Sequence, residues 1–192
     1  MIIGLTGAYC AGKNHVASML EAGGLPVLDV DKLGYQALAL EKERIFIEFG
    51  EDLRKTDGSV DRRLLGKRVF GNPEKLTALE LIVHPAANRF TDEWISIQKK
   101  HCAINAALLH RSSVFDKLDR IILVTAPLLT RVFRAKRRDN LSFSEIYKRF
   151  SSQKNFYAQY LSINAEIYRV ENSGFFGGAL KRQIDEILKG ME

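Results

Sequence analysis

The sequence predicts an α/β fold in which a five-stranded parallel sheet is flanked by helices. Short β-like runs alternate with longer helical stretches, and strands separated by helices indicate parallel pairing with right-handed crossovers. A glycine-rich loop joins the first run to a helix, which is typical of phosphate-binding α/β proteins. The five runs are Ile2–Leu5, Pro26–Val30, Cys102–Ala107, Arg120–Thr125 and Ile167–Glu171.

Composition is that of a globular protein, with 46% hydrophobic and 27% charged residues among 192. The apolar runs are far shorter than the roughly 18 residues of a membrane span, so no membrane association is expected. Met1–Leu5 leads into a loop and a charged helix, which favours a first strand over a signal peptide. The two cysteines, Cys10 and Cys102, show no paired pattern, so we expect a cytoplasmic location.

The net charge of +6 raises the question of a nucleic-acid partner. Many basic residues crowd into residues 131–149 instead of following a stripe with interleaved aromatics. This distribution favours a local site for phosphate groups, with a solvated helix face as the alternative. No nucleic-acid partner is expected.

The loop after the first strand matches the Walker A pattern except at its last position. Glycines allow its backbone N–H groups to point at a phosphate, the following helix adds its positive dipole end, and the lysine bridges the β- and γ-phosphates. A chance glycine-rich turn is the alternative interpretation. The residues expected to hold the triphosphate are Gly7, Ala8, Tyr9, Cys10, Ala11, Gly12, Lys13, Asn14 and His15.

Asn14 stands where the pattern has Ser or Thr, whose hydroxyl binds Mg²⁺. An amide oxygen can bind the ion or one of its waters, although the asparagine side chain is longer. We therefore expect Mg²⁺ to be held weakly or through water at this position, with substrate phosphates supplying other ligands.

Two carboxylates, Asp29 and Asp31, lie at the end of the second run, which reads Val27-Leu28-Asp29-Val30-Asp31. Ligands of open parallel sheets bind at the carboxyl ends of the strands, and residues two apart on a strand point the same way. One carboxylate is expected to accept a proton from an attacking hydroxyl, and the other to order the water around the metal ion. Alternatively, Asp31 only caps the next helix. A GTPase is excluded, because Asp31 to Gly34 follows the loop too soon and no Asn-Lys-x-Asp motif occurs.

One domain is expected over residues 1–192, with a core at 1–31, 101–130 and 160–192. Residues 32–100 are too long for one crossover helix and predict a helical insertion that binds substrate. Within it, Asp61 caps one helix, Asn72-Pro73 starts a second, and His84-Pro85 ends it before a third helix over residues 86–100.

Residues 131–159 predict a mobile helical lid. Arg131, Arg134 and Arg138 fall on one face of a helix that starts at Pro127 and is broken at Asp139-Asn140. Ser142 to Glu145 resembles a capping box that opens the next helix.

With these residues in place, the chain resembles the dephospho-CoA kinase family nearly end to end. Asp29-Val30-Asp31 is similar to the family's Asp-Ala-Asp. The insertion carries the most specific matches, which distinguish this family from other small phosphate-loop kinases: Phe49-Gly50, Asp57-Gly58, Asp61-Arg62, Leu65-Gly66, Val69-Phe70, Asn72 to Leu76, Leu79-Glu80 and His84-Pro85. The lid matches at Arg134, Arg138-Asp139, Arg149 and Gln153, and Asn172 with Gly174 resembles the family's turn beside the adenine.

The resemblance implies transfer of the γ-phosphoryl group of ATP to the ribose 3′-hydroxyl of dephospho-CoA, with Mg²⁺ as cofactor. Asp31 would be the base, and Lys13, Arg134 and Arg138 would stabilise the transferring charge. Lid closure would exclude water. A monomer is expected, with weak self-association left open. Beyond the loop, the resemblance implies contacts to ATP from Arg138, Arg149, Asn172 and Gly174, to dephospho-CoA from Asp29, Asp31, Arg62, Lys67 and His84, and to Mg²⁺ from Asn14 and Asp29.

Three positions depart from the family. They are Asn14, Arg111 in place of a family acid after the third strand, and Glu166 in place of an aspartate before the last strand. The alternatives are another small-molecule or nucleoside monophosphate kinase, and a nucleotide-binding regulatory relative that has lost the transfer. Arg62 and Lys67 could simply be solvated, and His84 could be a hydrogen-bonding residue at a helix end.

Overall fold

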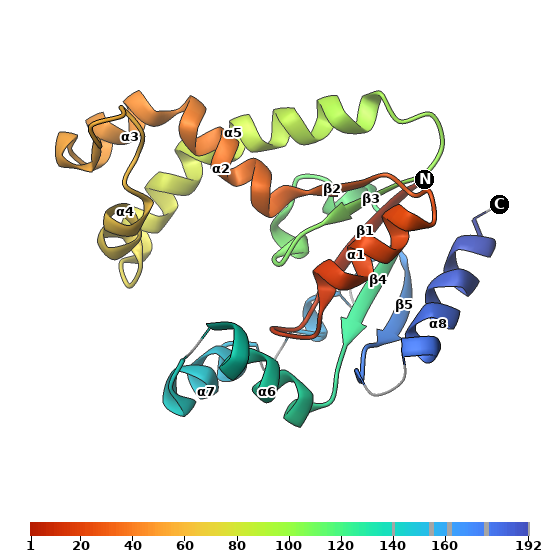
Figure 1. Cartoon of the computed structure of the whole chain (residues 1–192). Helices are drawn as coiled ribbons and strands as arrows, with labels where there is room; N and C mark the ends of the chain where they lie inside the picture. Colours follow the sequence, from red (N-terminus) through yellow and green to blue (C-terminus); the bar gives the residue numbers. More distant parts are fainter. Residues whose placement is uncertain (140, 154–155, 161–162, 175–176, 192) are drawn as a thin grey trace. The chain divides into compact units, whose positions relative to one another are not determined.

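The computed structural model describes residues 1–139, 141–153, 156–160, 163–174 and 177–191. The chain divides into two compact units, one formed by Met1–Asp29 with Gln98–Glu192 and the other by Val30–Ile97. The first unit holds the sheet and the second is helical (Figure 1). Among the described residues, no helix has both the length and the apolar character that a membrane crossing requires.

The sheet has five parallel strands in the order β2-β3-β1-β4-β5, so the predicted fold class is confirmed. The central strand β1 is flanked by β3 and β4, and the phosphate loop leaves its carboxyl end. The fourth strand has the predicted bounds, whereas the third ends two residues earlier than expected. The strands are β1 (Ile2–Gly7), β2 (Val27–Asp29), β3 (Cys102–Asn105), β4 (Arg120–Thr125) and β5 (Glu166–Glu171).

Burial explains why these runs form strands. Ile3, Leu5, Ile121 and Ile122 are fully buried on neighbouring strands, as is expected for a parallel sheet covered on both faces. Helices α1 and α8 contact each other and lie against the sheet, α1 on β1–β3 and α8 on β5. The helices of this unit are α1 (Lys13–Ala22), α6 (Leu128–Asp139), α7 (Phe143–Ser151) and α8 (Gly177–Lys189), with short 3₁₀ turns η2 (Leu109–Arg111), η3 (Phe115–Lys117) and η4 (Ala158–Tyr160).

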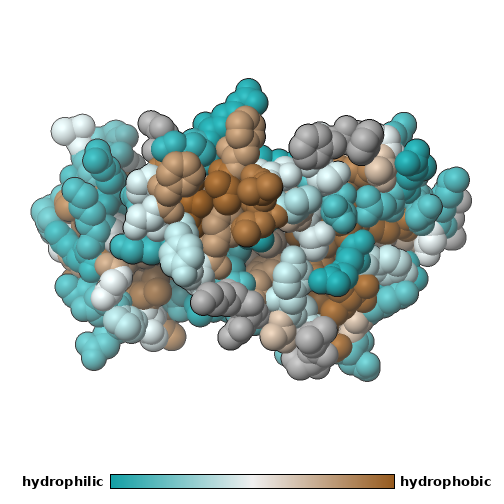
Figure 2. Space-filling model, turned by 90° about the horizontal axis from the view of Figure 1, so that it is seen from below, coloured by the Kyte–Doolittle hydropathy of each residue, from teal (hydrophilic) through white to brown (hydrophobic). Residues whose placement is uncertain are grey.

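Helices α6 and α7 form the region predicted to be the lid. The predicted capping box is present, because the Ser142 side chain accepts from the Glu145 N–H while the Glu145 side chain accepts from the Ser142 N–H. The two helices line an apolar groove of about 480 Å³. Figure 2 views the side on which they lie in Figure 1, and apolar side chains gather there. The groove is lined by Leu128, Val132, Phe143, Ile146, Tyr147, Phe150 and Ser151.

The helical unit is built around its own core. Phe46 is 1% exposed and packs with the other apolar residues of this cluster, Ile45, Phe49, Leu53, Val60, Leu65, Val69 and Ile82. Both predicted caps are confirmed, since Asp61 accepts from the N–H groups of Arg63 and Leu64, and Asn72 accepts from Lys75. The elements of this unit are α2 (Val30–Leu40), α3 (Lys42–Phe49), the 3₁₀ turn η1 (Glu51–Leu53), α4 (Arg62–Val69) and α5 (Pro73–Ser96).

One helix boundary was predicted wrongly. Helix α5 continues through Pro85 to Ser96, whereas His84-Pro85 was expected to end it. A proline inside a helix removes one hydrogen bond, here to the carbonyl of Leu81. Leu81 and Pro85 are both exposed, so water can reach that carbonyl, while Ala86 and Ala87 pack against Ala37 of α2. Packing on the buried side therefore keeps the helix continuous.

Candidate active site

The phosphate loop runs from the end of β1 to the start of α1, as predicted. Its two glycines are required sterically. A Cβ on Gly7 would lie 2.9 Å from the Val124 Cβ, and Gly12 has a φ of +94°. Gly12 is the N-cap of α1 and brings no capping side chain, so the helix presents its first N–H groups and its positive dipole end. This geometry suits a phosphate group.

The arginines on α6 lie on one helix face, as predicted, and two of them bind the backbone of the phosphate loop. The Nε of Arg131 donates to the carbonyl of Tyr9 at 2.8 Å. Arg134 donates to the carbonyl of Ala11 at 3.1 Å and to the Oδ1 of Asn172 at 3.1 Å. Helix α6 is therefore hydrogen-bonded to the phosphate loop.

Asn172 and Gly174 lie beside Arg134 at the phosphate loop. Asn172 is 6% exposed and its Nδ2 donates to the Ala11 carbonyl at 3.0 Å. Gly174 has a φ of +79°, and a Cβ there would lie 2.9 Å from Arg134. A pocket of about 320 Å³ opens beside them, lined by Gly12, His15, Arg134, Asn172, Ser173, Gly174 and Leu180. Several residues expected to bind ATP therefore line one pocket.

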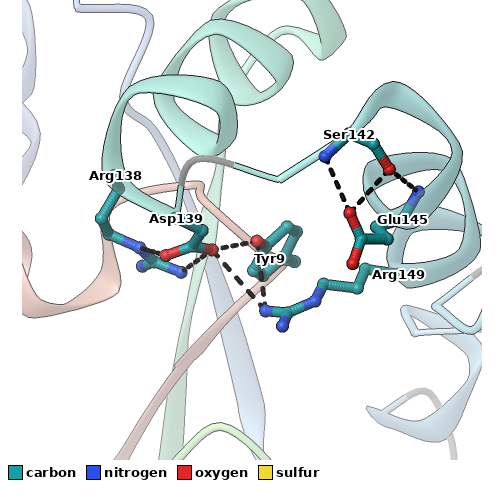
Figure 3. Close-up of polar contacts among 6 residues, drawn as sticks. All are labelled: Tyr9, Arg138, Asp139, Ser142, Glu145 and Arg149. Atoms are coloured by element: carbon teal, nitrogen blue, oxygen red, sulfur yellow. Dashed lines mark hydrogen bonds and ion pairs between the residues drawn. The ribbon is translucent and has the colours of Figure 1, made fainter.

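Arg138 and Arg149 meet at Tyr9 of the phosphate loop (Figure 3). The Asp139 carboxylate accepts two hydrogen bonds from Arg138, at 2.7 and 2.9 Å, and it also accepts from the Tyr9 hydroxyl. Hydrogen bonding by Arg138 holds the pKa of Asp139 at about 2. Arg149 donates to the Tyr9 hydroxyl at 3.3 Å. Both arginines assigned to ATP thus lie over the loop.

Polar side chains gather where β2 and β3 end. Asp29 pairs in register with Asn105, and Asn105 also pairs with Leu5 of β1. Asn105 is 2% exposed, and its Nδ2 donates to the Oδ1 of Asn14 at 3.3 Å. Its own Oδ1 is buried and has no hydrogen-bond partner among the described residues. An orphaned buried oxygen therefore lies beside the position where Walker A loops hold a metal ion.

The argument that placed Asp29 and Asp31 on one face was wrong. Strand β2 ends at Asp29, and Asp31 lies in the first turn of α2. The two-residue alternation of a strand does not apply across that boundary, because helical side chains follow a 3.6-residue period. Asp29 belongs to the sheet unit and Asp31 to the helical unit.

Arg62 lines a pocket within the helical unit. Its guanidinium stacks over the Tyr35 ring at 4.6 Å. Lys42 and Lys55 line the same pocket of about 340 Å³, so three cationic side chains and one carboxylate, Asp57, line it. This is a suitable site for an anionic group of a substrate.

His84 and Lys67 are not lining residues of that pocket. His84 lies on α5 and lines a separate pocket of about 230 Å³ with Glu80, Pro85 and Asn88 among others. Lys67 is exposed in the last turn of α4, where its charge complements the helix dipole. Arg62, Lys67 and His84, three of the five residues expected to bind the acceptor, are thus spread over the helical unit.

The other two departures, Glu166 and Arg111, lie at the start of a strand and at the end of a 3₁₀ turn. Glu166 is the first residue of β5 and forms an ion pair with Arg120 at 3.2 Å. Arg111 ends the 3₁₀ turn η2 after β3. Asn140, which was expected to help break the lid helix, lies outside the described residues.

Two features of this site were not predicted from the sequence. Asn105 could have been found, because a polar residue ending a buried strand is expected at the ligand-binding edge of a parallel sheet. No sequence pattern predicts that Arg138 and Arg149 lie over the Tyr9 ring. Gln153 also reaches the loop, since its Oε1 accepts from the Tyr9 N–H at 2.7 Å.

Comparison with known proteins gives consistent matches. Residues 1–167 match the family model described as dephospho-CoA kinase. The chain is 32% identical to the dephospho-CoA kinase of Treponema pallidum, over 97% of this chain and 93% of that protein. A crystal structure of a Thermus thermophilus protein matches with a TM-score of 0.85 and 33% identity, covering 100% of this chain and 98% of that one. The dephospho-CoA kinase of Campylobacter jejuni shares the fold, with a TM-score of 0.72, 24% identity and coverage of 98% and 95%.

Proposed function

The chain belongs to the dephospho-CoA kinase family, and we propose that it transfers the γ-phosphoryl group of ATP to the ribose 3′-hydroxyl of dephospho-CoA. Kinases of this family use ATP as the phosphoryl donor. The observation that carries the proposal for this chain is the intact phosphate loop, with Arg134 bound to it and to Asn172. We further propose a cytoplasmic location and a monomeric state.

The donor site is proposed at the loop. The backbone N–H groups of residues 7–13 and the start of α1 would hold the β-phosphate, and Lys13 would bridge the β- and γ-phosphates. The pocket beside Gly12, Asn172 and Gly174 would take the nucleoside.

The acceptor is proposed to bind the helical unit. Dephospho-CoA carries a diphosphate, and the pocket with Lys42, Lys55 and Arg62 offers three cations against the single carboxylate of Asp57 for such a group. Lys67 and His84 remain proposed contacts for other parts of this long molecule.

The residues at the ends of β2 and β3 fit a Mg²⁺ ion. Mg²⁺ prefers oxygen ligands and keeps several waters, and this edge offers the Asp29 carboxylate and the amide oxygens of Asn14 and Asn105. The buried orphan oxygen of Asn105 supports the fit, since it lacks a protein donor. When bound, the ion would neutralise charge on the phosphates.

In the proposed reaction, the Asp31 carboxylate accepts the proton of the 3′-hydroxyl. The freed oxygen forms a bond to the γ-phosphorus while the bond to the β–γ bridging oxygen breaks, and ADP leaves. Lys13, Arg134 and Arg138 would stabilise charge on the transferring group, and the lid would exclude water.

A coupled ADP-release assay tests the reaction. With ATP and Mg²⁺ present, dephospho-CoA should give turnover, and nucleoside monophosphates should not. Turnover with a monophosphate alone would contradict the proposal. Tight ATP binding without turnover on any acceptor would favour a regulatory relative.

The role of Asp31 has its own test. Asp31→Asn should abolish turnover while ATP affinity stays within a few-fold, because the base acts on the acceptor. Asp185→Asn, an exposed position on α8, is the matched control and should retain the wild-type rate. A near-normal rate in Asp31→Asn would mean that this residue only complements the dipole of α2 from its first turn.

Magnesium dependence tests position 14. Asn14→Ser should lower the Mg²⁺ concentration for half-maximal rate, because a hydroxyl is the usual ligand at this place. An unchanged requirement would mean that position 14 does not contact the ion or its waters.

A further inference from the structure

Tyr9 is held by side chains from both lid helices (Figure 3). Gln153, in the segment after them, also binds it. Its hydroxyl donates to Asp139 of α6 and accepts from Arg149 of α7 at 3.3 Å. Its backbone N–H donates to Gln153, and its carbonyl accepts from Arg131. Every polar group of this one loop residue is therefore bound by the lid.

The Tyr9 ring also contacts two arginines and one phenylalanine of the lid. The guanidinium of Arg138 lies 5.4 Å from the ring centroid, and that of Arg149 lies 5.2 Å from it. Guanidinium groups within about 6 Å of an aromatic centroid are attracted by the ring electrons. Phe150 of α7 meets the ring edge-on, with centroids 5.8 Å apart. The ring thus contacts two cations and one apolar residue of the lid.

The charges around the hydroxyl favour this arrangement at neutral pH. Partial burial, followed by the hydrogen bond to Asp139, raises the pKa of Tyr9, so the phenol remains protonated and can donate. Asp139 stays ionised and binds Arg138 through two hydrogen bonds while Arg149 approaches it at 3.6 Å. One carboxylate and one phenol therefore fix the orientation of both guanidinium groups.

We propose that Tyr9 is the positioning residue that docks the lid on the phosphate loop and aligns Arg138 and Arg149 for the nucleotide phosphates, which extends the proposed function. The loop backbone is fixed by β1 and α1, whereas an arginine side chain has many rotamers. A ring anchored in the loop reduces that freedom before ATP binds, and pre-organisation of this kind increases affinity. Tyr9 itself transfers no proton in the reaction.

The proposal predicts a graded response to two substitutions. Tyr9→Phe keeps the ring and loses only the hydroxyl contacts, so the KM for ATP should rise about threefold. Tyr9→Leu also loses the ring, and the KM should rise about tenfold, which corresponds to about 1.4 kcal/mol. In both variants kcat at saturating ATP should stay within threefold, because ATP itself then holds the arginines.

Hydrogen exchange in the nucleotide-free protein gives a readout that does not depend on turnover. The amides of α7 (Phe143–Ser151) should exchange faster in Tyr9→Leu and to an intermediate degree in Tyr9→Phe, and saturating ATP should remove the difference. Tyr147→Leu is the matched control, since Tyr147 lies on the same helix and is 67% exposed. It should leave ATP affinity unchanged.

The outcomes separate this proposal from the proposed reaction. Binding of a fluorescent ATP analogue and hydrogen exchange need no acceptor, so both remain informative if dephospho-CoA gives no turnover. Equal exchange of α7 in wild type and Tyr9→Leu, or equal ATP affinity, would overturn the docking role. If Tyr9→Leu does not fold, Tyr9→Phe is the remaining test. Hydrogen exchange and ATP affinity equal to wild type in Tyr9→Phe would then overturn the proposed role of the hydroxyl contacts.

Discussion

Replacement of Gly12 by alanine should weaken ATP binding by two to three orders of magnitude. Gly12 has a φ of +94°, a conformation that is unfavourable for any residue with a Cβ. A Cβ built there would lie 2.2 Å from the Nδ2 of Asn172. The methyl group must therefore displace either the loop or Asn172.

The magnitude follows from the contacts of Asn172. Left-handed backbone costs a residue with a Cβ about 1–2 kcal/mol. Displacement of Asn172 breaks its bond to the Ala11 carbonyl and the bond that it accepts from Arg134, at about 1 kcal/mol each. The sum is about 3–4 kcal/mol, and 1.4 kcal/mol is a factor of ten in affinity. The loss appears in binding because ATP needs the loop in its observed conformation.

Titration with a fluorescent ATP analogue measures this effect directly. Gly24→Ala is the matched control, because Gly24 has a similar φ of +87° and a Cβ there meets nothing within 4 Å. The control carries the same backbone strain without the clash and should bind ATP within twofold of wild type. In an Asn172→Ala background, Gly12→Ala should cost less than it does in wild type. Near wild-type affinity in Gly12→Ala would refute the steric argument.

Three further predictions concern stability. Burial lowers the pKa of His110, so the folded state binds a proton less readily than the unfolded chain and loses stability as pH falls below about 6.5. In His110→Gln, the free energy of unfolding measured in urea should therefore change less between pH 7 and pH 5. Arg138 holds the pKa of Asp139 at about 2, so the ionised carboxylate stabilises the fold above about pH 4, and this contribution is lost as pH falls toward 2. In Asp139→Asn, the melting temperature should therefore fall less between pH 5 and pH 3. Phe46→Ala should destabilise the chain by about 3–5 kcal/mol in urea unfolding, and its exposed neighbour Ile47→Ala should change stability by about 0.5 kcal/mol or less.

Features that depend on neighbouring residues in the chain were predictable. The caps at Asp61, Asn72 and Ser142 are local hydrogen bonds between a side chain and the next turn, so their residue types are sufficient to identify them. The bounds of β4 were also predictable, because a buried parallel strand is an uninterrupted apolar run between polar residues. The phosphate loop is local for the same reason.

Features that depend on tertiary packing were not predictable from residue type. Pro85 was expected to end a helix, and the buried contacts of Ala86 and Ala87 with Ala37 outweigh that local preference. Asp31 was treated as part of a strand because apolar and acidic residues alternate there, although the strand ends at Asp29. Short alternating runs at an element boundary fit a strand end and a first helical turn equally well.

Asn14 and Asn105, at the proposed metal site, are linked by a hydrogen bond, so a change at one affects the other. A serine hydroxyl at position 14 is shorter than the asparagine amide, so Asn14→Ser would leave the buried Nδ2 of Asn105 without its present acceptor. An unsatisfied buried donor costs about 1–3 kcal/mol, which would appear as lower stability even if the hydroxyl improved Mg²⁺ binding. In the sequence, Asn14 only replaces the usual hydroxyl ligand of the metal ion. In the structure, its amide oxygen also accepts the hydrogen bond of the buried Asn105 amide. The effects of Asn14→Ser on folding and on the metal ion can be separated by measuring stability and Mg²⁺ dependence on the same variant.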